Sequence, residues 1–280
     1  MIECKKLETL KEIEDNYNFF FIDLWGVVHN GVELFESVRS FLMRLKEKKK
    51  IIIFITNAPR RAFVISQQLQ QFGLSKNNYD YIVSSGEITW INLKKNYEKK
   101  KCFLIGPPRD YHLVEGLNVE IVENLAMGVD LIINTGPWGD NDKLENYTKL
   151  LNDLFKFNAP MICSNPDKKV IRGKNFMICA GLLAEYYEKI GGEVKYFGKP
   201  HNNIYEFSFK LINERKKILV IGDSLDNDIK GANLQNLDSV LITEGIHREV
   251  NNNNDIDKQK LDDLIKKKKI FPTFCMKNLN

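Results

Sequence analysis

The sequence predicts an α/β fold built on a parallel β-sheet, and two observations favour this class. Continuous apolar runs occur at residues 19–22, 51–55 and 218–221. These runs lack the alternation of polar residues that a half-exposed strand shows, so they are typical of strands buried on both faces of a parallel sheet. Segments with apolar residues at helical spacing, such as residues 37–46, lie between them. This alternation predicts parallel strands covered by helices.

Polar side chains follow four of the apolar runs, at the point where each strand is expected to end. They are Asp23, Thr56 with Asn57, Lys199 and Asp223. Ligands of parallel sheets bind just beyond the carboxyl ends of the strands. A single Asp in such a place could simply cap a turn or a helix. Four polar groups converging on one sheet edge favour a functional site over coincidence.

Between these runs, the middle third of the chain is expected to form a smaller α/β unit of its own. It contains short apolar runs at residues 102–105, 131–133 and 161–163, and helical patterns at residues 142–157 and 181–190. After residue 192 the pattern of buried strands and helices seen in the first part of the chain resumes. A helix is expected at residues 204–212, followed by the strand that ends at Asp223. Residues 1–18 are polar and mixed, and we expect a short helix there.

The bulk composition describes an ordinary globular protein of 280 residues, with 43% hydrophobic and 28% charged residues. Its net charge of +4 is too small to favour nucleic acid or an anionic membrane as the main partner. The five cysteines are odd in number and show no C-x-x-C spacing, so we expect free thiols in a reducing cytoplasm. We see no leader and no apolar run near 18 residues, and therefore expect neither secretion nor membrane insertion.

The residues at the strand ends suit a metal-assisted reaction on a phosphate. Asp23 and Asp223 supply the hard oxygen ligands that Mg²⁺ prefers. Lys199 and the backbone amides after Thr56 can balance the charge of a phosphoryl group during transfer. Asp23 could itself attack phosphorus and form an aspartyl-phosphate that water later opens.

Four motifs resemble those of the haloacid dehalogenase superfamily. They are D-L-W-G-V at Asp23, T-N at Thr56, G-K-P at Lys199 and G-D-S-L-D-N-D from Gly222. The insertion between the second and third motifs, the N-P-D at Asn165 and the helix G-L-L-A-E-Y-Y-E are similar to class IIA, the nitrophenyl-phosphatase and NagD-like group. The resemblance spans almost the whole chain. It implies a Rossmann-like core at residues 1–85 and 193–280, with an inserted α/β cap domain at residues 86–192.

The same resemblance implies roles for individual residues in a phosphatase. Asp23 would be the nucleophile, with Lys199 as the second catalytic residue. The residues implied to hold Mg²⁺ are Asp23, Trp25 through its main-chain carbonyl, Asp223, and Asp228, which would position a water ligand or Lys199. Those implied to bind the phosphoryl group are Thr56, Asn57, Ala58 and Lys199. Arg60 follows this loop and could reach the substrate, although we favour a surface arginine at a helix start.

The chain departs from the family at one position. Phosphatases of this superfamily carry a second Asp two residues after the nucleophile as general acid and base, and this chain has Trp25 there. A general acid and base of this kind raises the reaction rate about 10²- to 10⁴-fold, whereas the total acceleration of phosphate-monoester hydrolysis by enzymes reaches roughly 10²¹-fold. We therefore expect a slower enzyme, best on leaving groups that need no proton. His29 could substitute as the donor, but we favour a hydrogen bond from His29 to the local backbone.

Two other reactions or roles stay open at the level of sequence. Haloacid dehalogenases also carry an aromatic residue at the position of Trp25, so attack of Asp23 on carbon is an alternative. The acid-rich turn at residues 223–228 argues against this alternative. It favours a bound cation, and cleavage of a carbon–halogen bond needs none. A third interpretation is a catalytically degenerate protein that binds phosphate or a partner.

Several further residues carry weaker signals. Asn165 and Asp167 belong either to the cap face over the site or to an ordinary turn. Trp138 lines a substrate pocket or, as we favour, packs the cap. The remaining histidines, His112, His201 and His247, have no metal-like spacing. We expect a small phosphorylated metabolite as substrate, and the resemblance implies a homodimer that pairs through the cap.

Overall fold

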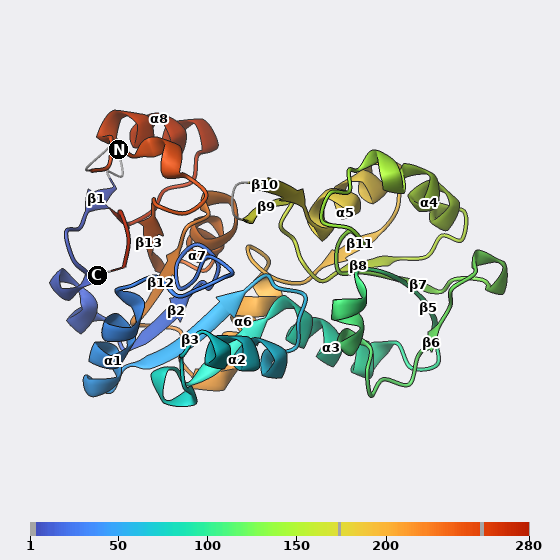
Figure 1. Cartoon of the computed structure of the whole chain (residues 1–280), viewed down its shortest axis with the longest axis horizontal. Helices are drawn as coiled ribbons and strands as arrows, with labels where there is room; N and C mark the ends of the chain where they lie inside the picture. The colour runs from blue at the N-terminus through green and yellow to red at the C-terminus, as the bar shows by residue number, and fades with distance from the viewer. Residues whose placement is uncertain (1–3, 173–174, 253–254, 280) are drawn as a thin grey trace. The chain divides into compact units, whose positions relative to one another are not determined.

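The computed structural model describes residues 4–172, 175–252 and 255–279 of the chain. The chain divides into two compact units, coloured by residue number in Figure 1. The first unit comprises Met1–Thr56, Ile65–Val83 and Tyr205–Asn280, and the second comprises Asn57–Val64 and Ser84–Ile204.

The first unit is built on a sheet that has seven strands in the described residues, in the order β1-β14-β13-β12-β2-β3-β4. Its strands are β1 (Lys5–Lys6), β2 (Phe19–Ile22), β3 (Ile51–Thr56), β4 (Tyr81–Ser84), β12 (Ile218–Gly222), β13 (Asp238–Ile242) and β14 (Phe274–Met276). Strand β2 lies between β12 and β3 and is parallel to both, with Phe21 opposite Val220 and Ile53. All three of these side chains are buried, as the apolar runs predicted.

Helices flank this sheet, and the apolar stripe by which such a helix packs is clearest in α1. Those of the first unit are α1 (Val38–Glu47), α7 (Lys230–Leu234) and α8 (Lys258–Lys268), while α2 (Ala62–Gln71) and α6 (Asn202–Ile212) contain residues of both units. In α1 the buried residues Val38, Phe41, Leu42 and Leu45 recur at helical spacing. Burial of that stripe, more than helix propensity, stabilises such a helix.

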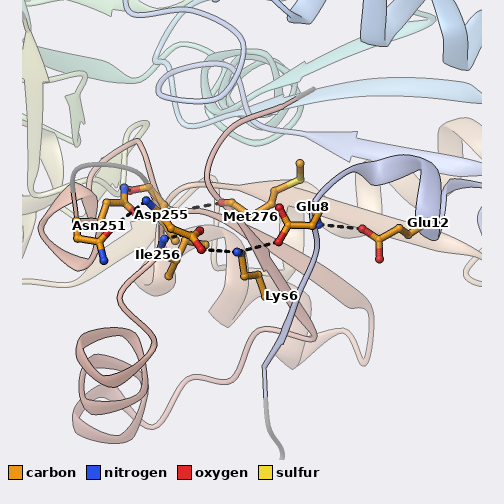
Figure 2. A network of polar contacts seen from close by, with 9 residues as sticks. Lys6, Glu8, Glu12, Asn251, Asp255, Ile256 and Met276 are labelled. Atoms are coloured by element: carbon orange, nitrogen blue, oxygen red, sulfur yellow. Dashed lines mark hydrogen bonds and ion pairs between the residues drawn. The ribbon is translucent and has the colours of Figure 1, made fainter.

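The short helix predicted for residues 1–18 is wrong in detail. The described part of this segment forms the edge strand β1, followed by two 3₁₀ turns at Leu10–Glu12 and Glu14–Asn16. Strand β1 pairs in parallel with β14, and the Lys6 ammonium contacts Asp255 at 2.6 Å and Glu8 at 2.8 Å (Figure 2). A strand of two residues is too short for a periodic pattern, so its pairing with residues 274–276 could not be read from the sequence.

The second unit has its own five-stranded parallel sheet in the described residues, in the order β11-β8-β7-β5-β6. Its strands are β5 (Lys101–Ile105), β6 (Glu120–Ile121), β7 (Leu131–Asn134), β8 (Met161–Cys163) and β11 (Val194–Tyr196), with a separate antiparallel hairpin of β9 (Lys169–Arg172) and β10 (Asn175–Ile178). Its helices are α3 (Ser85–Asn96), α4 (Glu145–Phe155) and α5 (Ala180–Lys189). Tyr147 of α4 and Tyr187 of α5 are fully buried in one apolar core with Ile132 of the sheet.

The observed architecture confirms the predicted fold class, α/β with Rossmann-like parallel sheets and flanking helices. None of the helices in the described ranges combines the length and the apolar character needed to cross a membrane.

Candidate functional site

Three buried carboxylates converge in the first unit. Asp23, Asp223 and Asp228 each offer an oxygen such that all three atoms lie within 4.8 Å of one another. Their exposed fractions are 8%, 8% and 1%. Among the described residues this is the one group of three or more His, Cys, Asp or Glu side chains close enough to hold a metal ion.

The backbone around each acid explains why they meet. Asp23 directly follows β2 and its N–H donates to the Ile221 carbonyl of the neighbouring strand at 2.8 Å. Asp223 follows β12, and its Oδ2 accepts a hydrogen bond from the Ile246 N–H at 2.8 Å. Since β2 and β12 are parallel neighbours, their two acids emerge side by side. Asp228 reaches them from a π-helical turn, Leu225–Ile229, a geometry frequent at functional sites.

Three glycines make room for these carboxylates. A Cβ on Gly26, whose φ is +83°, would lie 2.2 Å from Asp223 Oδ2, and one on Gly245 would lie 2.1 Å from the same atom. A Cβ on Gly222 would lie 2.0 Å from Asp228 Cγ. The backbone therefore wraps the acids more closely than any other residue type would permit. Gly26 and Gly222 belong to the sequence motifs, whereas Gly245 carries no signal in the sequence.

This donor set fits a hard divalent cation. Three like charges that are buried together repel one another, and a cation among them offsets that cost. Mg²⁺ prefers carboxylate oxygens and commonly uses only one or two of them. The roles of Asp23, Asp223, Asp228 and the main-chain carbonyl of Trp25 as metal ligands stay predictions.

The loop after Asp23 is held by contacts between Trp25, Gly31 and His29. The indole of Trp25 lies edge-on to the His29 ring at 5.5 Å, and a Cβ on Gly31 would lie 2.2 Å from Trp25 Cη2. His29 is 4% exposed, and its Nδ1 accepts a hydrogen bond from the Gly31 N–H at 3.0 Å. The Nδ1 atom therefore has a backbone partner in the loop, consistent with the interpretation favoured from the sequence.

In the second unit, Asn57 joins the loop after Thr56 to the G-K-P loop. Its Nδ2 donates to Lys199 O at 3.0 Å and to Asp167 Oδ1 at 2.8 Å, while its Oδ1 accepts from the Lys199 N–H at 2.7 Å. Asn57 and Lys199 are 4% and 3% exposed. The side-chain amide of Asn57 is therefore used within the second unit, and its role in phosphoryl binding stays a prediction. No motif or spacing in the sequence indicated that Asp167 is the hydrogen-bond partner of Asn57.

The G-K-P loop also depends on a glycine. Gly198 has a φ of +126°, and a Cβ there would lie 2.6 Å from Asn57 Oδ1 and 2.9 Å from Pro166 Cδ. The neighbouring Phe197 carbonyl accepts a hydrogen bond from the Ser85 hydroxyl. Of the other predicted phosphoryl-binding residues, Thr56 ends β3 in the first unit and is 6% exposed, and the Ala58 carbonyl accepts from the Gly86 N–H at 3.1 Å.

Arg60 is partly exposed, with 31% of its side chain accessible, and lies just before α2, as the favoured interpretation predicted. Its Nε lies 3.7 Å from Oδ1 of Asp110, a residue of the second unit that is 4% exposed. Burial raises the pKa of the Asp110 carboxyl, while the charges of Arg60 and Arg109 act in the opposite direction. Asp110 follows a Gly-Pro-Pro turn in the sequence, and nothing in that local pattern distinguishes it from a turn residue.

The remaining predicted residues have contacts of their own. The indole of Trp138 packs on the ring of Tyr147, with ring centroids 5.1 Å apart, and Trp138 is still 44% exposed. Asn165 Oδ1 accepts from the Asp167 N–H at 3.1 Å, which shapes the N-P-D turn. His201 stacks on Tyr196 with ring centroids 5.0 Å apart. Across the described ranges, no histidine belongs to a metal-ligating group of three.

Two family models match the chain. One, described as haloacid dehalogenase-like hydrolase, matches residues 20–120, and the other, described as HAD-hydrolase-like, matches residues 196–276. The crystal structure of a hydrolase of the haloacid dehalogenase-like family from Brucella suis 1330 is similar, with a TM-score of 0.85 and 34% sequence identity. That similarity covers 98% of this chain and 100% of the other.

Two curated relatives extend along most of the chain. The acid sugar phosphatase of Staphylococcus epidermidis is 22% identical over 273 residues, which are 95% of this chain and 96% of that protein. The 4-nitrophenylphosphatase of Schizosaccharomyces pombe is 24% identical over 275 residues, covering 88% of this chain and 91% of that protein. Motifs, fold and matches agree, and the chain belongs to the haloacid dehalogenase-like hydrolase family, in its class IIA group.

Proposed function

We propose that this hydrolase is a Mg²⁺-dependent phosphatase that removes the phosphoryl group from a small phosphorylated metabolite through an aspartyl-phosphate. The observation that carries the proposal is the cluster of Asp23, Asp223 and Asp228, three buried carboxylates within 4.8 Å. The names of the curated relatives, a sugar phosphatase and a nitrophenylphosphatase, support the reaction type.

In the proposed reaction an Asp23 oxygen attacks phosphorus while the bond from phosphorus to the leaving oxygen breaks. The leaving group departs as an alkoxide or, if it obtains a proton, as an alcohol. Water then attacks phosphorus, the bond to Asp23 breaks, and inorganic phosphate forms with the carboxylate restored. Bound Mg²⁺ supplies positive charge that stabilises the charge on the phosphoryl oxygens.

We propose that Lys199 and the loop formed by Thr56, Asn57 and Ala58 balance the remaining charge of the phosphoryl group, as the family resemblance implies. We propose that backbone N–H groups of this loop bind phosphoryl oxygens, because hydrogen bonds to Lys199 and Asp167 already use the Asn57 amide. In this proposal residues 1–85 and 193–280 form the catalytic core, and residues 86–192 form the cap.

Trp25 is proposed to weaken proton donation to the leaving group. Its ring packs against Gly31 and His29 and offers no acid. This enzyme would then hydrolyse substrates whose leaving groups need no proton, such as aryl or acyl groups, faster than substrates whose leaving groups need one.

The proposal also includes a cellular setting. All five cysteines, Cys4, Cys102, Cys163, Cys179 and Cys275, are free thiols, which supports a reducing cytoplasm. A homodimer that pairs through the cap is proposed on the family resemblance, and sedimentation of the purified protein would test it.

A substrate screen tests the proposed function. Purified protein with Mg²⁺ is assayed for phosphate release from phosphorylated metabolites and 4-nitrophenyl phosphate, and for halide release from haloacids. We expect phosphate release that depends on Mg²⁺ and is lost in Asp23→Asn. Halide release would indicate attack on carbon, while binding of phosphate esters without turnover would indicate a degenerate protein.

A further inference from the structure

Two cysteines that are far apart in the sequence meet at the edge of the first sheet. Cys4 directly precedes β1, and Cys275 lies in the middle of β14, the strand with which β1 pairs in parallel. The pairing places Cys275 opposite Lys6, and side chains two positions apart along a strand point to the same face. Cys4 and Cys275 are therefore diagonal neighbours at this edge, within the first unit.

Packing and a shared cavity support this proximity. Cys4 packs on the apolar cluster that contains Cys275 together with Leu261 and Ile265 of α8. Both cysteines also line one cavity of about 350 Å³. Cys275 is 2% exposed, whereas Cys4 is partly exposed. A small oxidant can reach the pair through this cavity.

The charge around the pair favours a thiolate on one of the two sulfurs. Lys5, Lys6 and Lys258 line the same cavity. A hydrogen bond from the Cys4 thiol lowers the pKa of Cys275 and raises that of Cys4. Burial opposes the lowering at Cys275, while the Lys6 ammonium adds to it. Cys275 is thus the more acidic member, and it is the thiolate that reacts with peroxides.

The other three cysteines have a different environment. Cys102, Cys163 and Cys179 are buried. Burial raises the pKa of Cys102 and of Cys163 to about 12, and it also raises the pKa of Cys179. Buried cysteines with raised pKa values are unreactive. Cys163 and Cys179 are a useful comparison, because the charge of Cys163 acts on Cys179 and the two are therefore near each other.

We propose that Cys4 and Cys275 form a redox site that hydrogen peroxide converts to a disulfide, which ties β1 to β14. The Cys275 thiolate attacks one peroxide oxygen and the O–O bond breaks, which leaves a sulfenic acid on Cys275. The departing hydroxide takes up the proton that Cys275 had lost and becomes water. The Cys4 thiol then attacks the Cys275 sulfur, the S–O bond breaks, and the Cys4 proton leaves with the hydroxide as a second water. The two sulfurs give up two electrons, which the peroxide accepts.

The position of the bond determines its effect. Sulfur atoms in a disulfide are about 2.05 Å apart, so the two thiols must approach each other. Cys4 precedes an edge strand of two residues, so a small shift of its backbone breaks few ladder hydrogen bonds. The bond would close a loop that contains nearly the whole chain, and the stabilisation from constraining the unfolded chain increases with loop length. Free thiols at rest agree with this site, because disulfides of cytosolic proteins are usually transient and redox-sensing.

Mapping of the disulfide tests this proposal. Reduced protein is treated with a small excess of hydrogen peroxide, catalase is added, and the protein is denatured in N-ethylmaleimide and digested without reductant. Mass spectrometry should find a peptide that joins Cys4 to Cys275, with the other three cysteines alkylated, and dithiothreitol should reverse the link. The melting temperature of the linked protein should rise by roughly 5 °C or more.

Substitutions separate this pair from the other cysteines. Cys275→Ser and Cys4→Ser should each show no link and no rise in melting temperature after peroxide. If Cys275→Ser does not fold, Cys4→Ser, at the partly exposed member, makes the same test. The matched control Cys163→Ser, at a cysteine of the second unit, should keep both the link and the rise.

Four outcomes in the wild-type protein would overturn the proposal. They are five alkylated cysteines after peroxide, oxidation that stops at a sulfinic acid on one cysteine, a preferred link between Cys163 and Cys179, and an unchanged melting temperature in the linked protein. Each is measured without a phosphate ester, so the result does not depend on the proposed phosphatase function.

Discussion

In the first unit, Gly26 and Asp223 are so close that a Cβ on Gly26 would lie 2.2 Å from the carboxylate Oδ2. Gly26 also has a φ of +83°, in the left-handed region. The close approach is needed because Asp223 lies between two backbone segments, the other at Gly245. The turn after β2 therefore helps to fix the position of one member of the acidic cluster.

The substitution Gly26→Ala is expected to displace Asp223 and to weaken Mg²⁺ binding at least about tenfold, as changes around metal ligands typically do. Gly116→Ala is a matched control, because Gly116 has a φ of +71° but nothing within 4 Å of its Cβ position. Both variants should lose about 1–2 kcal/mol from backbone strain. Isothermal titration measures the Mg²⁺ affinity of both variants. Equal affinity in the two would contradict the proposal that the close approach of Gly26 positions Asp223 for the cation.

Asp223→Asn should have opposite effects on stability with and without the cation. Without Mg²⁺ it relieves repulsion among three buried carboxylates, so its melting temperature should exceed that of the wild type. With Mg²⁺ at about 100 times the dissociation constant, the wild type should gain about 2.7 kcal/mol, which the variant lacks. Thermal melts at both conditions check this. The exposed Asp226→Asn, at a residue paired with Lys268, is the control.

The acidic cluster shows how far sequence alone can lead. Asp23 and Asp223 could be predicted because each directly follows a buried strand, and neighbouring parallel strands place such residues together. The residues that hold these acids in place, such as Gly245, could not be predicted from the sequence. Gly245 lies 22 positions after Asp223, in a loop without periodicity, and its role depends on a contact that only the folded chain creates.

The same limit applies in the second unit. The motif G-K-P marked Lys199, but the hydrogen bonds from Asn57 to Asp167 and Lys199 join segments more than 100 positions apart. Asp110 had no signal at all, since its distinction is burial with an unfilled acceptor. The strand β1 was mistaken for a helix because two residues carry no period.

Trp25 should make the rate depend steeply on the leaving group. Across a series of aryl phosphates, log kcat/KM should fall as the pKa of the leaving phenol rises, since no acid donates a proton to it. Trp25→Asp should flatten this dependence, at some cost in stability from lost packing against Gly31. Trp25→Phe keeps an aromatic ring and should retain the steep slope. A flat slope in the wild type would show that a proton donor is present.

Asp110 should make stability depend on pH. Burial raises its pKa, and Arg60, Arg109 and the Thr135 hydroxyl only partly oppose this. The folded protein then holds this proton more tightly than the unfolded chain, so the contribution to stability is full below about pH 3.8 and is lost as pH rises through the raised pKa.

Asp110→Asn cannot titrate and should lose this dependence. Guanidinium unfolding at pH 4.5 and pH 7 should show the free energy of unfolding shifting in favour of the variant at the higher pH. Asp140→Asn, at an exposed position, should follow the wild type at both values. A shift in favour of the wild type at pH 7 would mean that Arg60 stabilises the charged form by more than burial costs.

Attack by Asp23 on phosphorus is the central claim, and a covalent label tests it most directly. The protein is mixed with Mg²⁺ and a ³²P-labelled aryl phosphate, quenched with acid within milliseconds to seconds, and digested for mapping. We predict label on the peptide that contains Asp23, released by hydroxylamine as an acyl-phosphate, and no label in Asp23→Asn. Rapid phosphate release without labelled protein, or undiminished turnover in Asp23→Asn, would contradict the account.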